Sequence, residues 1–267
     1  MNAAGTQSPA HELITIPISH YCEKARWALE RAGISYREKA HLQVLHRIAA
    51  RRAGGGLTVP VLVCPLGVFA DSTEILEYAD HAGASLYLED QQAGGEVRTL
   101  EDHFDEVLGP HARRWMYHNI SDQKKLVREY GATGIPGWQR RLLPVLWRTA
   151  APVINRVLDI DDETAAASLS RTQEVFDEVG ERLADGRRFL VGERFTAADL
   201  SFAALSAAVT VPEQYGVPLP QPHLLPEPMR SRVLEFRDHP AGRFALRMYA
   251  QERPGATRAR RTAAAVA

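Results

Sequence analysis

The chain has 267 residues, of which 45% are hydrophobic and 24% charged, proportions typical of soluble globular proteins rather than of disordered or collagen-like chains. Its 32 basic and 33 acidic residues leave a net charge of -1, so no general attraction to nucleic acid or to an anionic membrane is expected. Two cysteines argue against a disulfide-stapled secreted framework. No apolar run is close to the roughly 18 residues that a membrane-spanning helix needs, so no stable membrane insertion is expected. Met1–Ala10 lacks the features of a secretory signal. We therefore expect a soluble, cytoplasmic protein.

Strand and helix patterns alternate in the first third of the chain. Apolar residues at three- and four-residue spacing predict a helix that Gly33 ends. Two strands joined by a tight turn are expected before the third helix. The predicted order is β-α-β-α-β-β-α, a mixed sheet with helical cover, over Glu12–Ile16, His20–Ala32, Ser35–Lys39, His41–Arg52, Val59–Val63, Gly67–Ala70 and Ser72–Ala82.

Strand signals almost vanish after Gly83, and a loop through Gly94–Gly95 is expected to link the two halves. Thr196 and Asp199 form a capping box before a segment that is apolar nearly all round, which predicts a central buried helix. The expected units are residues 1–83, an all-helical domain over 96–252, and a mobile tail over 253–267. Helices are predicted near Val97–His118, Trp138–Leu158, Ala165–Ala184, Ala197–Val209 and Met229–Ala250.

The first predicted helix begins at Ser19-His20-Tyr21-Cys22, directly after the first strand. A side chain at such a junction lies beside free backbone N–H groups and the positive end of the helix dipole, which stabilise an anion. Serine is also a favoured N-cap. Ser19 can therefore act as a cap alone, or as a cap whose hydroxyl also donates to a bound thiolate.

Two later segments also allow a structural and a functional interpretation. Pro60 precedes a strand and can be an ordinary edge residue, whereas a cis Val59–Pro60 bond would turn the Val59 N–H and C=O toward an extended peptide. Asp71 or Ser72 caps the next helix. The same two residues can instead hold an ammonium group with the Asp71 carboxylate and a carboxylate with the Ser72 hydroxyl and N–H.

In this order and at this spacing, the segments resemble the cytosolic glutathione transferase family. Ile18–Leu29 resembles its first strand-helix unit, Thr58–Leu62 its cis-proline loop, Asp71–Tyr78 the start of its γ-glutamyl-binding helix, and Phe189–Leu200 its capping signature in the second domain. The resemblance covers most of the chain. It implies a thioredoxin-like α/β N-terminal domain, an all-α C-terminal domain, glutathione as co-substrate with no metal, and a homodimer.

The resemblance also implies roles for single residues. Ser19 stands at the position of the catalytic serine of the serine-type classes, and Cys22 is then expected to be a small buried residue without dithiol chemistry. Val59 and Pro60 would meet the glutathione backbone. Asp71, one methylene shorter than the Glu often found there, and Ser72 would hold the γ-glutamyl end. A cation for the glycyl carboxylate is sought among His41, His46, Arg51 and Arg52, with His41 chosen.

An electrophile pocket is expected between the two domains. His20 and Tyr21 are the candidates nearest the thiol, and Trp115 and Tyr117 lie on the helix after the linker, although aromatic side chains there can equally belong to the core.

The stretch from Asn119 to Leu169 is longer than a compact helical domain of this family requires. Within it, Trp138–Arg148 carries an amphipathic basic pattern interrupted by Pro144. This stretch can be an ordinary packed helix pair, a lid over the electrophile pocket, or a helix that contacts a partner or a membrane surface.

The implied reaction is attack of a glutathione thiolate on a small hydrophobic electrophile. A cysteine-like thiol with a pKa near 8.5 is only a few per cent ionised at neutral pH, and lowering that pKa by about 1–2 units takes on the order of 1.4–2.7 kcal/mol. A hydroxyl hydrogen bond and a helix N-terminus can supply this. The alternatives are glutathione-dependent peroxidase, dehalogenase or isomerase chemistry, or a non-catalytic binding or interaction protein on the same scaffold.

Overall fold

The computed structural model describes residues 10–253, apart from some side chains between residues 144 and 155. The mobile tail expected over 253–267 lies outside these residues except for Arg253. That residue is docked rather than free, because its guanidinium pairs with the buried carboxylate of Glu23 at 2.8 Å and with Glu30.

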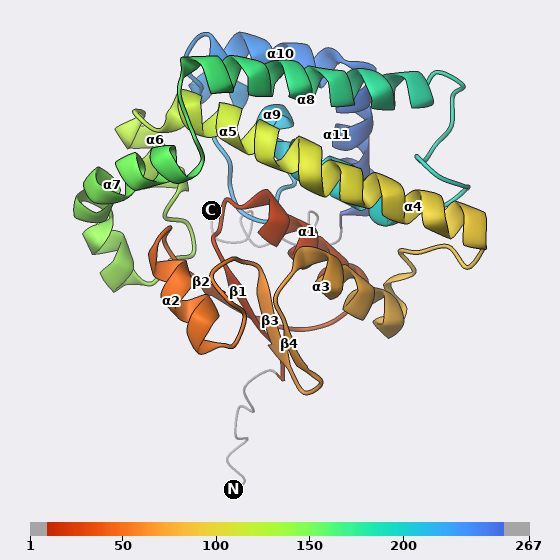
Figure 1. Cartoon of the computed structure of the whole chain (residues 1–267), viewed down its shortest axis with the longest axis horizontal. Helices are drawn as coiled ribbons and strands as arrows, with labels where there is room; N and C mark the ends of the chain where they lie inside the picture. The colour runs from red at the N-terminus through yellow and green to blue at the C-terminus, as the bar shows by residue number, and fades with distance from the viewer. Residues whose placement is uncertain (1–9, 254–267) are drawn as a thin grey trace, which may run out of the picture.

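The N-terminal domain is built on one four-stranded sheet with the strand order β2-β1-β3-β4 (Figure 1). Strand β2 runs parallel to β1, whereas β3 and β4 are antiparallel to their neighbours. This is the thioredoxin-like order expected from the sequence. Its elements are β1 (Glu12–Thr15), α1 (His20–Arg31), β2 (Arg37–Ala40), α2 (Leu45–Arg52), β3 (Val61–Cys64), β4 (Gly67–Phe69), α3 (Ser72–Ala79) and the π-helical turn η1 (Asp80–Ala84).

Neighbouring side chains of β1 point to opposite faces of the sheet, as the pleat of a strand requires. Leu13 packs with apolar residues of α1 and α3, and these two helices also contact each other. Ile14 packs with Ala50 of α2 on the other face. Helices therefore cover both faces, and α1 and α3 form the side that meets the second domain.

The C-terminal domain is all helical, and α9 lies at its centre with every one of its residues buried. The predicted capping box of Thr196 and Asp199 is present at its start. The elements are α4 (Gln91–His103), η2 (Phe104–Leu108), α5 (Gly109–Ile120), α6 (Lys124–Tyr130), α7 (Gly137–Val157), α8 (Asp162–Arg182), α9 (Ala197–Thr210), η3 (Pro222–Leu224), α10 (Met229–Asp238) and α11 (Pro240–Glu252).

Two sequence predictions about this domain are wrong. Gly94 and Gly95 lie inside α4 rather than in a linker, because the Asp90 side chain caps the helix by accepting from the Ala93 N–H at 2.8 Å. The single helix expected over Met229–Ala250 breaks at His239, whose ψ of 145° is extended as favoured before a proline.

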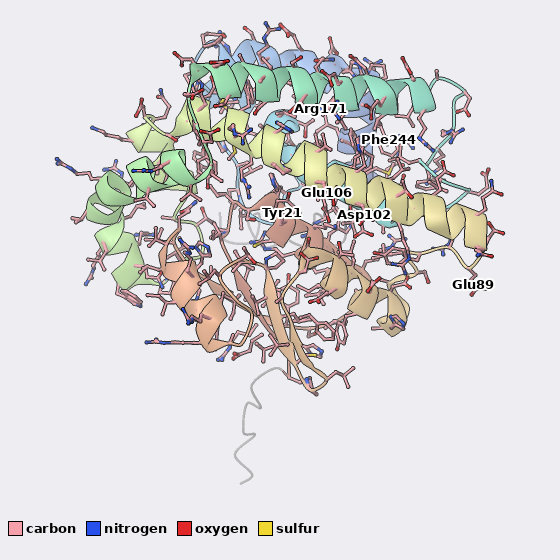
Figure 2. All side chains as sticks on the ribbon, in the orientation of Figure 1. Tyr21, Glu89, Asp102, Glu106, Arg171 and Phe244 are labelled. Atoms are coloured by element: carbon pink, nitrogen blue, oxygen red, sulfur yellow. The ribbon has the colours of Figure 1, made fainter. Side chains whose placement is uncertain are left out.

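The two domains share one hydrophobic core and a buried ion-pair network. Trp27 of α1 and Leu76 of α3 belong to the same apolar cluster as α9. Lys24 of α1 lies between Glu101 of α4 and Asp105 of η2, with Nζ 2.9 Å and 2.5 Å from their carboxylate oxygens. The domain interface is therefore closely packed around α1, and the side chains in Figure 2 show Tyr21 at this junction.

Candidate functional site

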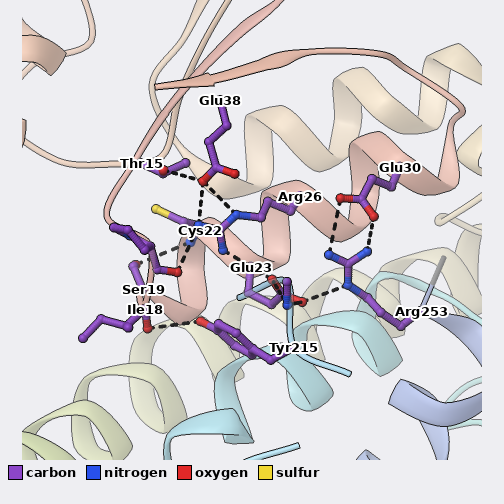
Figure 3. Close-up of polar contacts among 12 residues, drawn as sticks. Thr15, Ile18, Ser19, Cys22, Glu23, Arg26, Glu30, Glu38, Tyr215 and Arg253 are labelled. Carbon is purple, nitrogen blue, oxygen red and sulfur yellow. Dashed lines mark hydrogen bonds and ion pairs between the residues drawn. The ribbon is translucent and has the colours of Figure 1, made fainter. Parts of the chain in front are cut away.

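Ser19 is the N-cap of α1, with extended backbone and a side chain that accepts from the Cys22 N–H at 3.4 Å (Figure 3). Within residues 10–253 the Cys22 thiol is also a hydrogen-bond partner of this side chain. Because a thiol sulfur is a weak acceptor, the hydroxyl can turn to donate to an anionic group that enters from the cleft. The Cys22 side chain is fully buried, and burial raises the pKa of its thiol to about 11, so it stays protonated at neutral pH.

The backbone around Ser19 is held from both domains. Tyr215, which follows α9, donates its hydroxyl to the Ile18 carbonyl at 3.1 Å, and Arg26 donates to the Pro17 carbonyl at 3.0 Å. Figure 3 shows that Arg26 belongs to a network with Glu23, which also binds Arg253 at the end of α11. The turn that carries Ser19 is therefore a rigid position rather than a free loop.

The sheet register brings three of the predicted motifs to one edge. Ser19 follows the carboxyl end of β1, and Val59–Pro60 precedes β3, whose first residues pair with the last residues of β1. Asp71 follows β4, which ends beside the start of β3. The Val59–Pro60 peptide bond is cis. The backbone of Val59 takes part in no hydrogen bond within residues 10–253, so both its polar groups are available.

A cleft of about 350 Å³ opens between the domains beside Ser19. The N-terminal domain contributes residues from the start of α1, from α2 and its approach, and from the loop before β3, while the helical domain contributes α5 and the end of α7. Its main polar lining is formed by Ser19, His20, Tyr21, Gln43, His46, Arg47, Thr58, Arg113 and Tyr117.

An apolar cavity adjoins this cleft and shares His20, Met116 and Tyr117 with it. Helices α6 and α7 close one side with Leu126 and Trp147, and the segment after α9 closes another. The Trp147 indole N–H donates to the Ser121 carbonyl at 3.2 Å, which fixes α7 against the end of α5. The long stretch noted in the sequence therefore packs as helices and also walls the cavity.

His20 lies where the two cavities meet and is 5% exposed. Burial, aided by the charge of Arg113, lowers the pKa of its imidazole to about 3, so the ring is neutral at pH 7. Its Nε2 is buried and has no hydrogen-bond partner among the residues described. Tyr21 instead donates its hydroxyl to the Asp105 carbonyl at 2.7 Å, and burial raises the pKa of this phenol.

Asp71 and Ser72 lie at the start of α3 and outside the lining of the cleft. The Asp71 carboxylate caps α3 by accepting from the Thr73 N–H at 2.7 Å, which settles the choice of cap between the two residues. Asp71 is exposed, whereas Ser72 is buried. Both belong to the sheet edge that carries Ser19.

His41 and Trp115 are placed differently from their expected roles. The His41 ring is paired with the Gln139 side chain of α7 at 3.0 Å and does not line the cleft. Its neighbours His46 and Arg47 do line it. Trp115 is buried in the helical core against Phe236, 6.4 Å between ring centroids, while Tyr117 lines both cavities.

Gln43 and Arg113 are cleft residues that the sequence alone did not indicate. The Gln43 amide donates to the Tyr117 hydroxyl at 3.1 Å across the domain boundary. Neither residue belongs to a local motif, because each reaches the cleft only through packing of the two domains. Arg113 is one helical turn before Tyr117, a spacing that could have marked it once Tyr117 was a candidate.

Comparison with known families agrees with this geometry. Residues 13–85 match the family model described as "Glutathione S-transferase, N-terminal domain", and residues 162–223 match the corresponding C-terminal domain model. Together the two matches cover half of the chain. The chain belongs to the glutathione S-transferase family.

Solved glutathione transferase structures share the fold at low sequence identity. A theta-class member from Xanthomonas axonopodis pv. citri with glutathione bound is 18% identical, with a TM-score of 0.55 over 89% of this chain and 97% of that one. A member from Methylobacterium radiotolerans in complex with glutathione sulfonate is 19% identical, with a TM-score of 0.58 over 93% of each chain. One from Phanerochaete chrysosporium with oxidized glutathione is 15% identical, with a TM-score of 0.60 over 95% of each. No curated protein sequence matches the chain.

No helix within residues 10–253 is long and apolar enough to cross a membrane. No group of three or more His, Cys, Asp or Glu side chains in this part of the chain is placed to hold a metal ion.

Proposed function

We propose that this glutathione S-transferase family member is an enzyme that activates the glutathione thiol as a thiolate and adds it to a hydrophobic electrophile. The observation that carries the proposal is the Ser19 hydroxyl, which lies at the N-terminus of α1 and lines the inter-domain cleft, with the Cys22 thiol, a weak acceptor, as its side-chain partner among the described residues. In this proposal the N-terminal domain binds glutathione and the helical domain supplies the electrophile pocket.

The thiolate is stabilised by two groups that act on the same atom. Because the Ser19 oxygen accepts from the Cys22 N–H, its own O–H can point outward to the glutathione sulfur. The N-terminus of α1 adds a partial positive charge at the same place. A hydrogen bond to a charged group contributes about 1.5–3 kcal/mol, which is enough to lower a thiol pKa by about 1–2 units.

The remainder of glutathione follows the edge of the sheet. The unpaired N–H and C=O of Val59 would bond the cysteinyl backbone, next to Pro60. Asp71 and Ser72 at the start of α3 would bind the γ-glutamyl ammonium and carboxylate, and for Asp71 this adds to its capping role. For the glycyl carboxylate, Arg47 on α2 replaces His41, because Arg47 lines the cleft and His41 is bonded to α7.

The reaction then needs no nucleophile from the protein. The sulfur lone pair forms a bond to the electrophilic carbon, and the leaving group departs with its bonding pair or, in an addition, the electrons move onto the acceptor. The cleft holds both reactants in one place, which replaces a bimolecular encounter.

The test combines retention on immobilised glutathione with conjugation of a chromogenic aryl halide, followed over pH. Ser19→Ala and Ser19→Gly both remove the hydroxyl, but glycine preserves most of the N-cap preference and alanine does not. We expect both variants to lose thiolate at neutral pH by about tenfold, despite different stabilities. Asp161→Ala, which removes the exposed N-cap of α8, is the control and should keep the pH–rate profile of the wild type. If the profile of both Ser19 variants also stays unchanged, Ser19 has no part in the reaction, and failure of the wild type to bind glutathione would favour a non-catalytic protein.

A further inference from the structure

We infer that Arg113 and His20 form a subsite for an anionic oxygen group, so that the electrophile of this protein is an apolar molecule that carries a carboxylate group. The inference deepens the proposed function and rests on it, because it assigns the class of the second substrate in the same cleft.

Arg113 is a cation in the cleft wall that contacts the Tyr21 ring but pairs with no carboxylate of the described residues. It extends from α5 into the cleft beside Ser19, and its buried Nε has no hydrogen-bond partner in the part of the chain that the structure describes. No ion pair between residues 10 and 253 involves it. Its neighbour Arg114 is bonded to the Leu158 carbonyl at 2.8 Å and to the Ser168 hydroxyl at 3.0 Å.

The fully buried lysine and arginine side chains among the described residues are paired with carboxylates, whereas the half-buried Arg113 is not. Lys24 lies between two carboxylates, and Arg26 and Arg253 both contact Glu23. Burying a charged group is unfavourable unless it is paired. An arginine half-buried in a cleft, with a shielded Nε and no carboxylate, therefore has the properties of a site completed by an anionic ligand.

His20 supplies a second polar atom in the same region. Its Nε2 is buried and unpartnered, and its ring contacts Tyr21 with the ring centroids 4.7 Å apart. The guanidinium of Arg113 lies 5.9 Å from the centroid of the same Tyr21 ring. Both groups therefore lie near the Tyr21 ring, and the charge of Arg113 acts on His20. A neutral imidazole can carry its proton on Nε2 and donate it to a carboxylate oxygen.

The rest of the cleft agrees with an anionic ligand. Its lining contains Arg47 and Arg113 but no Asp or Glu among the described residues. Asp105, the nearest acidic residue to Tyr21 that the hydrogen bonds record, already pairs with Lys24. Two cations on opposite domains match two anions, the glycyl carboxylate of glutathione at Arg47 and the carboxylate of the electrophile at Arg113.

The apolar cavity next to His20 determines the other half of the substrate. Its lining, which includes Met116, Leu126 and Leu219, carries no Asp, Glu, Lys or Arg side chain among the described residues. An aromatic or aliphatic body there would place a carboxylate at Arg113 and His20. For an arylmethyl halide, the sulfur–carbon bond forms as the carbon–halogen bond breaks and halide leaves with the electron pair, while the carboxylate is unchanged.

The experiment compares 4-(chloromethyl)benzoate with its methyl ester as substrates for glutathione conjugation. For each, kcat/KM is divided by the rate of the uncatalysed reaction, and the ratio of the two values is measured for the wild type and for Arg113→Gln. Since a charge-assisted hydrogen bond changes an equilibrium by about 10- to 100-fold, we expect this acid-to-ester ratio to fall by that factor, chiefly through KM. Arg113→Lys should retain part of the wild-type preference for the acid. His20→Phe should lower the acid-to-ester ratio by a smaller factor than Arg113→Gln does.

Arg128→Gln is the matched control, because Arg128 is exposed on α6 outside the cleft, and its acid-to-ester ratio should equal that of the wild type. An unchanged ratio in Arg113→Gln overturns the inference while leaving the proposed function intact. Calorimetric binding of 4-methylbenzoate and its methyl ester to the same proteins covers the case in which neither halide is conjugated. If Arg113→Gln then binds 4-methylbenzoate more weakly than the wild type does, the subsite is supported although the proposed function fails. If the two proteins bind it equally, the subsite and the proposed function are both overturned.

Discussion

Lys24→Met removes the ammonium group that joins α1 to the helical domain. The Lys24 Nζ contacts Glu101 at 2.9 Å and Asp105 at 2.5 Å, and the side chains of Lys24 and Glu101 are 0% and 1% exposed. The substitution leaves two carboxylates without a counter-charge where little water can reach them. Breaking a buried pair from one side costs about 3–5 kcal/mol, so the free energy of unfolding at pH 7 should fall by about that amount, a large part of the 5–15 kcal/mol typical of a protein.

Urea denaturation followed by tryptophan fluorescence and by far-ultraviolet circular dichroism measures this loss. Lys39→Met is the control, because Lys39 pairs with Glu12 at 2.6 Å on the surface, where its side chain is 42% exposed. An exposed pair of this kind contributes about 0–1 kcal/mol. The two variants therefore lose the same kind of group, from a buried ion pair in one case and from an exposed one in the other.

The pH dependence of the Lys24→Met loss follows from Asp105. Burial raises the pKa of this carboxyl above its usual range even with Lys24 present. The folded variant therefore binds protons more tightly than the unfolded chain, and its stability falls as the pH rises. The deficit relative to the wild type should therefore shrink as the pH is lowered and Asp105 takes up a proton. A loss no larger than that of Lys39→Met, or a deficit independent of pH, would refute the reasoning.

Two other variants test the helical domain and its contact with α1. The buried carboxylate of Asp199 accepts from two backbone N–H groups at 2.7 Å each. Asp199→Ala should therefore lower the free energy of unfolding by about 2–3 kcal/mol. Asp161→Ala, which removes an exposed cap, should lower it by about 1 kcal/mol, and equal losses in urea denaturation would contradict this reasoning. A Cβ on Gly109 would lie 2.2 Å from the Tyr21 hydroxyl oxygen, so Gly109→Ala should cost about 1–3 kcal/mol. In a double-mutant cycle Tyr21→Phe should reduce that cost, and strict additivity would argue against the contact.

Features encoded in a few consecutive residues could be predicted from the sequence. The capping box of Thr196 and Asp199 and the start of α1 at Ser19 are both local, because the side chain and the N–H that it caps lie three residues apart. The order of helices and strands along the first domain followed from the alternation of patterns, and its thioredoxin-like class from the family resemblance. The break at His239 was missed, although Pro240 directly after it is a local signal for the end of a helix.

Features that depend on packing between distant segments could not be predicted. His41 was chosen as a cation for glutathione, but Gln139, far along the chain on α7, occupies its ring. Arg113 and Gln43 reach the cleft only where the two domains meet, as the hydrogen bond from Gln43 to Tyr117 shows, and no pattern near either residue records that. Gly94 and Gly95 were predicted to lie in a linker because of their low helix propensity, but the local cap at Asp90 outweighs it and both lie in α4.

The central claim is that the Ser19 hydroxyl and the N-terminus of α1 make the glutathione sulfur anionic. The most direct test is the ultraviolet absorbance of the thiolate in the binary complex with glutathione, titrated with pH for the wild type and for Ser19→Gly. The account predicts a thiol pKa about 1–2 units below the free value near 8.5 in the wild type, and a value close to the free one in the variant. The same pKa in both proteins, or a bound thiol that titrates like free glutathione in the wild type, would contradict it.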